Sequence, residues 1–137
     1  TASGWFKNPL SDVESDHIYF KTPTLVEKAK NCEKPLIISE CGGYTLKIEN
    51  HVWNPKAKYG YGSSNSKQEL TQKIAQMYKK MIIPAIKHGL SGCVYTQLSD
   101  VEDEINGFYT YDRKVCKVEK EAMLEIAEKI KRINNFE

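Results

Sequence analysis

The segment Pro35-Leu36-Ile37-Ile38-Ser39-Glu40-Cys41-Gly42-Gly43 joins a run of apolar residues to a carboxylate and two glycines. Because its apolar residues are continuous and do not alternate with polar ones, the run predicts a strand of a buried parallel sheet over residues 35–39. In parallel α/β folds the working side chains stand where strands end. Glu40 follows this strand directly and is therefore the leading catalytic candidate. The alternative is a structural ion pair with one of the many lysines.

A second continuous apolar run, over residues 92–98, predicts another parallel strand, and a long helix is expected between the two strands. The helix begins with the capping box Ser66-x-x-Glu69 and runs to about Lys87. Pro84 is expected to kink it, and Gly89 suits the left-handed position just past its end. Apolar residues recur along one face at the spacing of a buried stripe, namely Leu70, Ile74, Met77, Tyr78, Met81 and Ile82.

The remaining chain continues this alternation of strands and helices. Residues 17–20 predict a short third strand, residues 25–31 a weak helix, and residues 118–133 a final helix. The order of elements indicates an α/β fold with right-handed connections and a sheet buried on both faces. The apolar positions of the final helix are expected to face inward, and these are Ala122, Met123, Ile126, Ala127, Ile130 and Ile133.

Composition bounds the class of protein. A length of 137 residues suits one domain, and 40% hydrophobic with 28% charged residues is typical of a globular chain. The net charge of +2 is scattered, which argues against nucleic acid, and no apolar stretch reaches the ~20 residues of a membrane span. Four cysteines without a C-x-x-C pair predict mostly reduced thiols; the location is left open, with the cytoplasm favoured. No cofactor is indicated.

The loop from Tyr44 to Asn65 has no clear periodicity, and loops of this length in compact domains are usually either functional lids or disordered. Aromatic rings beside a carboxylate suit a ligand with apolar faces and polar edges, such as a sugar. We favour Trp53 as a ligand contact, although some of these rings must simply pack the loop. The aromatic, histidine and glycine residues of the loop are Tyr44, His51, Trp53, Tyr59, Gly60, Tyr61 and Gly62.

Other polar residues are weaker candidates. The acidic run of residues 100–104 lacks the ligand spacing of an EF-hand loop, so we interpret it as solvated charge or helix capping and predict no metal site. Asp12 and His17 are placed near another strand end, where His17 could bond a substrate hydroxyl or be a core residue. His88, beside a helix end, is interpreted as structural.

Residues 35–44 resemble the nucleophile strand of glycoside hydrolase family 2, the β-galactosidase and β-glucuronidase group. Four further motifs resemble the same family in the same order, so the resemblance covers nearly the whole chain. They are Thr1-Ala2-Ser3-Gly4-Trp5-Phe6 with Asp12-x-x-Ser15-x-His17-x-Tyr19-Phe20, His51-x-Trp53-Asn54 with Tyr59-Gly60-Tyr61-Gly62, Tyr95-Thr96-Gln97-Leu98-Ser99-Asp100-Val101-Glu102 with Asn106-Gly107, and Tyr109-x-Tyr111-Asp112-Arg113-Lys114.

The resemblance implies that residues 1–137 form the C-terminal half of a TIM (β/α)8 barrel, with three to four parallel βα units. It implies that Glu40 is the nucleophile of a retaining β-glycosidase acting on a carbohydrate substrate by double displacement. His17 and Trp53 would line the sugar pocket, and so could Tyr19 and Gln97.

The chain departs from the family pattern in two ways. Cys41 stands where the family usually has tyrosine or phenylalanine. The family's acid/base glutamate follows an asparagine, yet the sequence contains no Asn-Glu pair, and a complete barrel needs ~250 residues. We therefore expect a piece that is inactive alone, completed by the remainder of a parent barrel. Its exposed half-barrel is expected to self-associate.

Two other functions stay open from the sequence. One is a non-catalytic carbohydrate-binding or scaffold module, in which the aromatic loop binds and Glu40 only pairs with a lysine. The other is a cysteine hydrolase that uses Cys41 with His17 or His51, which requires a lowered thiol pKa.

Overall fold

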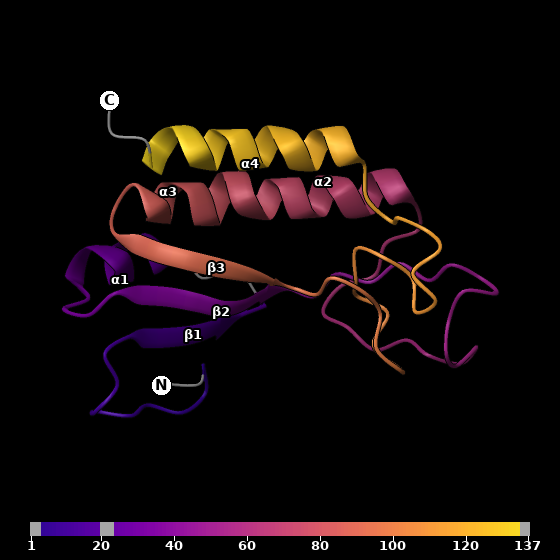
Figure 1. The fold of residues 1–137 in the computed structure, drawn as a ribbon, viewed down its shortest axis with the longest axis horizontal. Coiled ribbons are helices and arrows are strands. Elements are labelled where there is room, and N and C mark those ends of the chain that lie inside the picture. Colours follow the sequence, from indigo (N-terminus) through magenta and orange to yellow (C-terminus); the bar gives the residue numbers. More distant parts are fainter. Residues whose placement is uncertain (1–3, 20–23, 135–137) are drawn as a thin grey trace.

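The structure is a computed structural model, and it describes residues 4–19 and 24–134. As predicted, the fold is α/β, with a three-stranded parallel sheet in the order β1-β2-β3. Figure 1 shows the long connections that follow β2 and β3 gathered at the end of the sheet where the strands finish. The elements are β1 (Glu14–Ile18), α1 (Leu25–Asn31), β2 (Leu36–Gly42), α2 (Lys67–Met77), the π-helix η1 (Tyr78–Ile82), α3 (Ile83–Ile86), β3 (Leu90–Thr96) and α4 (Lys120–Asn134).

The strand boundaries differ from those expected. β1 starts three residues before His17, and Asp12 therefore lies before the strand and not at its carboxyl end. β2 continues through Glu40 to Gly42, because it keeps pairing with β3 beyond Ser39. β3 stops at Thr96, where the peptide bond to Gln97 is cis. The expected strand residue Phe20 and the motif residues 1–3 lie outside the described residues.

Helices cover one face of the sheet, and the main core lies between these helices and the sheet. Val94, on the opposite face of β3, is 56% exposed, so the expectation of a sheet buried on both faces is wrong there. In Figure 1, α2 and α3 follow each other in one line above β3, and α4 lies alongside them. The buried residues of the main core are Ile18, Leu25, Ala29, Leu36, Ile38, Cys41, Met77, Ile82, Ala85 and Leu90.

The long helix begins where its sequence predicts and is interrupted by a π-helical turn before Pro84. Ser66 Oγ accepts a hydrogen bond from the Glu69 backbone N–H at 3.1 Å, but the Glu69 carboxylate bonds the N–H of Asn65 instead of that of Ser66. The turn before Pro84 is π-helical, and the Ile83 N–H bonds the Tyr78 carbonyl. Since proline has no N–H to donate, the helix accommodates it by widening its preceding turn. A π-helical segment therefore occurs next to the position where the sequence predicts a kink.

Beyond this helix, Gly89 has φ +105°, which confirms the expected left-handed residue. A Cβ there would also meet the Ala29 carbonyl oxygen at 3.2 Å, so glycine allows the turn to pass close to α1.

α4 packs on the outside of the helical layer. It starts at Lys120, two residues later than expected, and Val118 before it is buried in a second core cluster with Leu46, Leu70 and Ile74. Ile126 is buried as predicted, whereas Ala127 is exposed, contrary to the expectation for it. α4 contacts α2 and α3, and its Met123 packs against the second core cluster. No helix among the described residues has the length and apolarity needed to cross a membrane.

The Ser66 cap gives a direct test of the helix start. Ser66→Ala removes the acceptor for the Glu69 N–H, so we expect the free energy of unfolding to fall by about 1 kcal/mol. Urea denaturation followed by circular dichroism measures it. The control Gln72→Ala, at an exposed position within α2, should stay within about 0.5 kcal/mol of the parent. Equal losses in the two variants would contradict the role of the cap.

Candidate functional site

A β-bulge in β2 sets the direction of Glu40. On the β1 side, Asp16 pairs with Ile38 and His17 with Glu40, so β2 holds one extra residue between the two pairs. The β3 side shows the same excess, because Ile38 pairs with Cys93 and Cys41 with Tyr95. A bulge interrupts the alternation of faces along a strand. Ile38 and Cys41 consequently both lie in the core beneath the helices, and the two residues between them face the other way.

The neighbouring strand β1 places polar residues on that same face of the sheet. This face lies opposite the helices, and we refer to it as the open face. Ile18 of β1 lies in the helix-side core, so by alternation His17 and Tyr19 point to the opposite face. Ser15 precedes them on this face and bonds Ser39 across the two strands, with 2.6 Å between the hydroxyl oxygens. Glu40, His17 and Tyr19 are thus brought together by strand geometry, although they are far apart in sequence.

Glu40 is held by a phenol and remains open to solvent. The Tyr19 hydroxyl donates a hydrogen bond to Glu40 Oε2, and the side chain of Glu40 is 40% exposed. Burial, and then this hydrogen bond, raise the pKa of Tyr19, so the phenol stays protonated as a donor. His17 Nδ1 lies 3.4 Å from the same oxygen without the alignment of a hydrogen bond, and this buried nitrogen has no hydrogen-bond partner among the described residues. The arrangement suits a carboxylate that reacts with a ligand entering from the open face.

Tyr61 is a site residue that the sequence left open. Its ring stacks on Tyr19 with centroids 3.7 Å apart and planes 15° from parallel. A Cβ at Gly43, where φ is +68°, would approach the Tyr61 ring to 2.6 Å, so only glycine lets both rings lie against this backbone. A hydrogen bond with Tyr59 is the main cause that raises the pKa of Tyr61 to about 12. The tyrosine-glycine motif of the loop therefore builds the wall next to Glu40.

Gln97 lies just beyond β3, and its amide is engaged within its own loop. Its Nε2 donates to Asn106 Oδ1 at 2.8 Å and to Glu104 Oε2 at 3.2 Å. Thr96, one residue earlier, contacts the hydroxyl of Tyr19. The end of β3 thus reaches the Glu40 site through Thr96, whereas the role of Gln97 in binding stays a prediction.

Trp53 belongs to a different group of side chains. It is 60% exposed, and its ring lies 5.2 Å from that of Tyr111. Beside it, His51 Nδ1 is 2.8 Å from Asp112 Oδ2. The structure therefore joins Trp53 to the loop after β3, and the sugar contact expected of it is not tested by these contacts.

A buried ion pair between Lys117 and Asp100 was not predicted from the sequence. Lys117 Nζ, fully buried, donates to Asp100 Oδ1 at 2.6 Å and to the carbonyls of Leu46 and Ile105, each at 3.0 Å. Asp100 also accepts from the Gly107 N–H at 2.8 Å, so it is not the solvated charge that its acidic neighbours suggested. Burial raises the pKa of Asp100 and lowers that of Lys117. The one signal in the sequence was a lysine directly before Val118, within a short apolar run.

Cys41 does not fit a nucleophile role. Its side chain is fully buried on the helix side of β2, while His17 lies on the open face and His51 pairs with Asp112. A hydrogen bond with Cys93 and burial raise its pKa, the opposite of what an attacking thiol needs. The cysteine hydrolase hypothesis is therefore not supported by the geometry.

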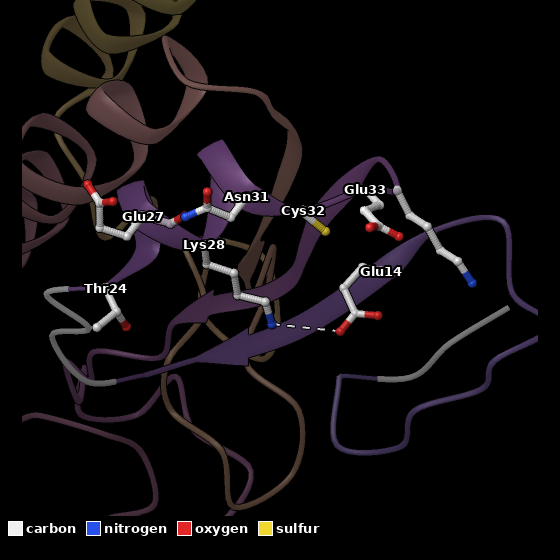
Figure 2. A pocket seen from close by; sticks show the side chains of 8 residues that line it. Glu14, Thr24, Glu27, Lys28, Asn31, Cys32 and Glu33 are labelled. Atoms are coloured by element: carbon white, nitrogen blue, oxygen red, sulfur yellow. Dashed lines mark hydrogen bonds and ion pairs between the residues drawn. The ribbon is translucent and has the colours of Figure 1, made fainter.

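A cavity beside α1 lies apart from the Glu40 site. Figure 2 shows that Glu14 and Lys28 line it. Their side chains form an ion pair, with Lys28 Nζ 3.7 Å from Glu14 Oε1. Because Lys28 projects from α1, this cavity is on the helix side of β1, opposite to His17 and Tyr19. No group of three metal-ligating side chains occurs in residues 4–19 and 24–134.

Comparison with known proteins adds no relative. No protein-family model matches the chain, and no curated protein matches it significantly.

The buried ion pair predicts a large effect on stability. Asp100→Asn leaves the ammonium of Lys117 buried without a counter-charge, so the free energy of unfolding should fall by about 3–5 kcal/mol. Urea unfolding measures this loss, and adding Lys117→Met to the variant should recover part of it. Lys114→Met, which changes an exposed lysine, is the matched control and should have little effect. A loss from Asp100→Asn no larger than that of the control would refute the structural role of the pair.

Proposed function

We propose that this chain is the nucleophile-bearing part of a retaining β-glycosidase of the glycoside hydrolase family 2 type, with Glu40 as the nucleophile. The observation that carries the proposal is the position of the Glu40 carboxylate. It lies on the open face of a parallel sheet, near the carboxyl ends of β1, β2 and β3, and accepts a hydrogen bond from Tyr19. This is where catalytic side chains of parallel barrels stand.

The proposed chemistry is a double displacement. Glu40 attacks the anomeric carbon and forms a covalent glycosyl-enzyme, while a second carboxyl group ~5–5.5 Å away protonates the leaving oxygen. Water then hydrolyses the intermediate with that second group acting as base. Because the Tyr19 hydroxyl donates to Oε2, it orients the carboxylate so that Oε1 makes the attack. The phenol also stabilises the carboxylate that is released when the intermediate breaks down.

The surrounding residues support a carbohydrate as the ligand. His17 Nδ1, which has no hydrogen bond to any described residue, is proposed to bond a sugar hydroxyl beside the reacting carbon. The stacked rings of Tyr19 and Tyr61 offer an apolar surface next to the carboxylate, as C–H faces of a sugar require. Trp53, on a partly exposed aromatic pair with Tyr111, is a further proposed contact for the same substrate.

The second carboxyl group is proposed to come from outside this chain. A (β/α)8 barrel has eight strands, and the described residues contain three. β3 is an edge of the sheet, where an additional parallel strand of the parent barrel would pair. The substrate pocket would be closed by that remainder, so the piece alone lacks both the acid/base and much of the sugar-binding surface.

Replacement of Glu40 tests the nucleophile. In the complete barrel, Glu40→Gln should reduce turnover of aryl β-glycosides by a factor on the order of 10⁴, as loss of an essential catalytic group does. Ligand binding, measured by calorimetry, should persist. Glu49→Gln, at an exposed loop carboxylate, is the matched control and should keep full activity.

Two results would overturn parts of this proposal. Full turnover by Glu40→Gln would exclude Glu40 as nucleophile. Substantial turnover by residues 1–137 alone, abolished by Glu40→Gln, would show that no remainder of a barrel is required.

The open face and the edge of β3 predict self-association of the isolated chain. Val94 exposes 56% of its surface on this strand, and the backbone groups along an unpaired edge favour pairing with another chain. Static light scattering should give a mass above the 15.7 kDa of the monomer. Val94→Lys should shift the mass toward the monomer, while Lys87→Gln on the helix side should not. A clean monomer for the parent chain would contradict this expectation.

A further inference from the structure

Two cysteines meet on the helix side of the sheet, directly behind the strand that carries Glu40. Cys41 follows Glu40 in β2, and Cys93 lies on the adjacent strand β3. Both face the core beneath the helices, where Cys93 packs against the cluster that contains Cys41. The two thiols lie close enough for each to shift the pKa of the other, and Cys41 Sγ donates to the Val94 carbonyl oxygen at 3.3 Å.

The bulge in β2 creates this contact. In regular alternation, Ile38 and Glu40 would share a face and Cys41 would point to the open side. With one extra residue in β2, Cys41 turns into the core beside β3. The residue that the sequence marked as unusual for its position is therefore half of a thiol pair.

The two thiols differ in burial and acidity. Cys41 is fully buried, whereas Cys93 is only partly buried. Hydrogen bonds from Cys41 and Tyr78 lower the pKa of Cys93, while the pKa of Cys41 is raised. Since the thiolate is the form that reacts with oxidants, Cys93 should react first and Cys41 should resolve the product.

We propose that Cys41 and Cys93 are an oxidative modification site, which a peroxide converts into an intramolecular disulfide between β2 and β3. In the first step the Cys93 sulfur attacks an oxygen of hydrogen peroxide, the O–O bond breaks, and a sulfenic acid and one water form. In the second step the Cys41 sulfur attacks the Cys93 sulfur, the S–O bond breaks, and a disulfide and a second water form. Two thiols are thus oxidised and one peroxide is reduced. This inference does not depend on the proposed glycosidase function.

The other cysteines provide an internal comparison. Cys32 lies at the rim of the cavity in Figure 2, just past α1. Cys116 Sγ donates to the Val118 carbonyl at 3.4 Å. Cys32 borders the same core cluster as Cys93, but it precedes the start of β2, whereas Cys41 lies near the end of that strand. Cys116 borders the second core cluster. A specific reaction should therefore leave both as free thiols, as all four cysteines are in this structure.

The test is peptide mapping of the folded chain after treatment with hydrogen peroxide. Remaining thiols are blocked with iodoacetamide under denaturing conditions, and the protein is digested and analysed without reduction. We expect the alkylated thiols to fall from four to two, and a cross-linked peptide pair joining Cys41 to Cys93 that dithiothreitol separates. Cys32→Ser should retain the cross-link, whereas Cys93→Ser should lose it and leave Cys41 alkylated.

Three outcomes would overturn the proposal. One is oxidation of Cys93 to sulfinic or sulfonic acid with Cys41 still alkylated. Another is a cross-link that joins Cys32 or Cys116 in preference to the pair. The third is equal formation of the Cys41–Cys93 cross-link in urea, because the reaction would then owe nothing to the folded contact. The wild-type map and the urea comparison need no substitution, so they test the proposal even if a variant fails to fold.

Discussion

The buried ion pair between Lys117 and Asp100 is the contact on which the loops around Glu40 depend. Lys117 reaches the carbonyl of Leu46, in the loop after β2, and that of Ile105, in the loop after β3. Both charges are out of water, so any arrangement of the loops that separated them would leave one uncompensated, at a large cost in free energy. The long loop that carries Tyr61 is thereby held against the end of the sheet.

A second constraint is the extra residue of β2, which has consequences on both faces of the sheet. On the open face it brings Glu40 next to His17 and Tyr19. On the helix side it turns Cys41 toward Cys93. One irregularity in hydrogen-bond register thus produces both the proposed nucleophile site and the proposed thiol pair. Bulges near functional sites commonly re-aim side chains in this way.

Several features could be predicted because their causes are local. The parallel strands followed from continuous apolar runs, the start of α2 from Ser66, and the turn after α3 from Gly89. The expectation that Ala127 faces inward was wrong, because the share of an amphipathic helix that is covered depends on the elements packed against it. Glu40 was chosen as the catalytic candidate for its place after an apolar run; in the structure the strand continues past it and its carboxylate accepts a hydrogen bond from Tyr19.

The order of strands and helices, the apolar stripes and the helix cap were determined by the sequence itself, because each arises from residues within a few turns of one another. The direction of Glu40, the stacking of Tyr61 on Tyr19 and the pairing of Lys117 with Asp100 were decided only in the tertiary structure. These contacts join residues about 17 to 42 positions apart, and they depend on a register shift and on burial that no single segment encodes.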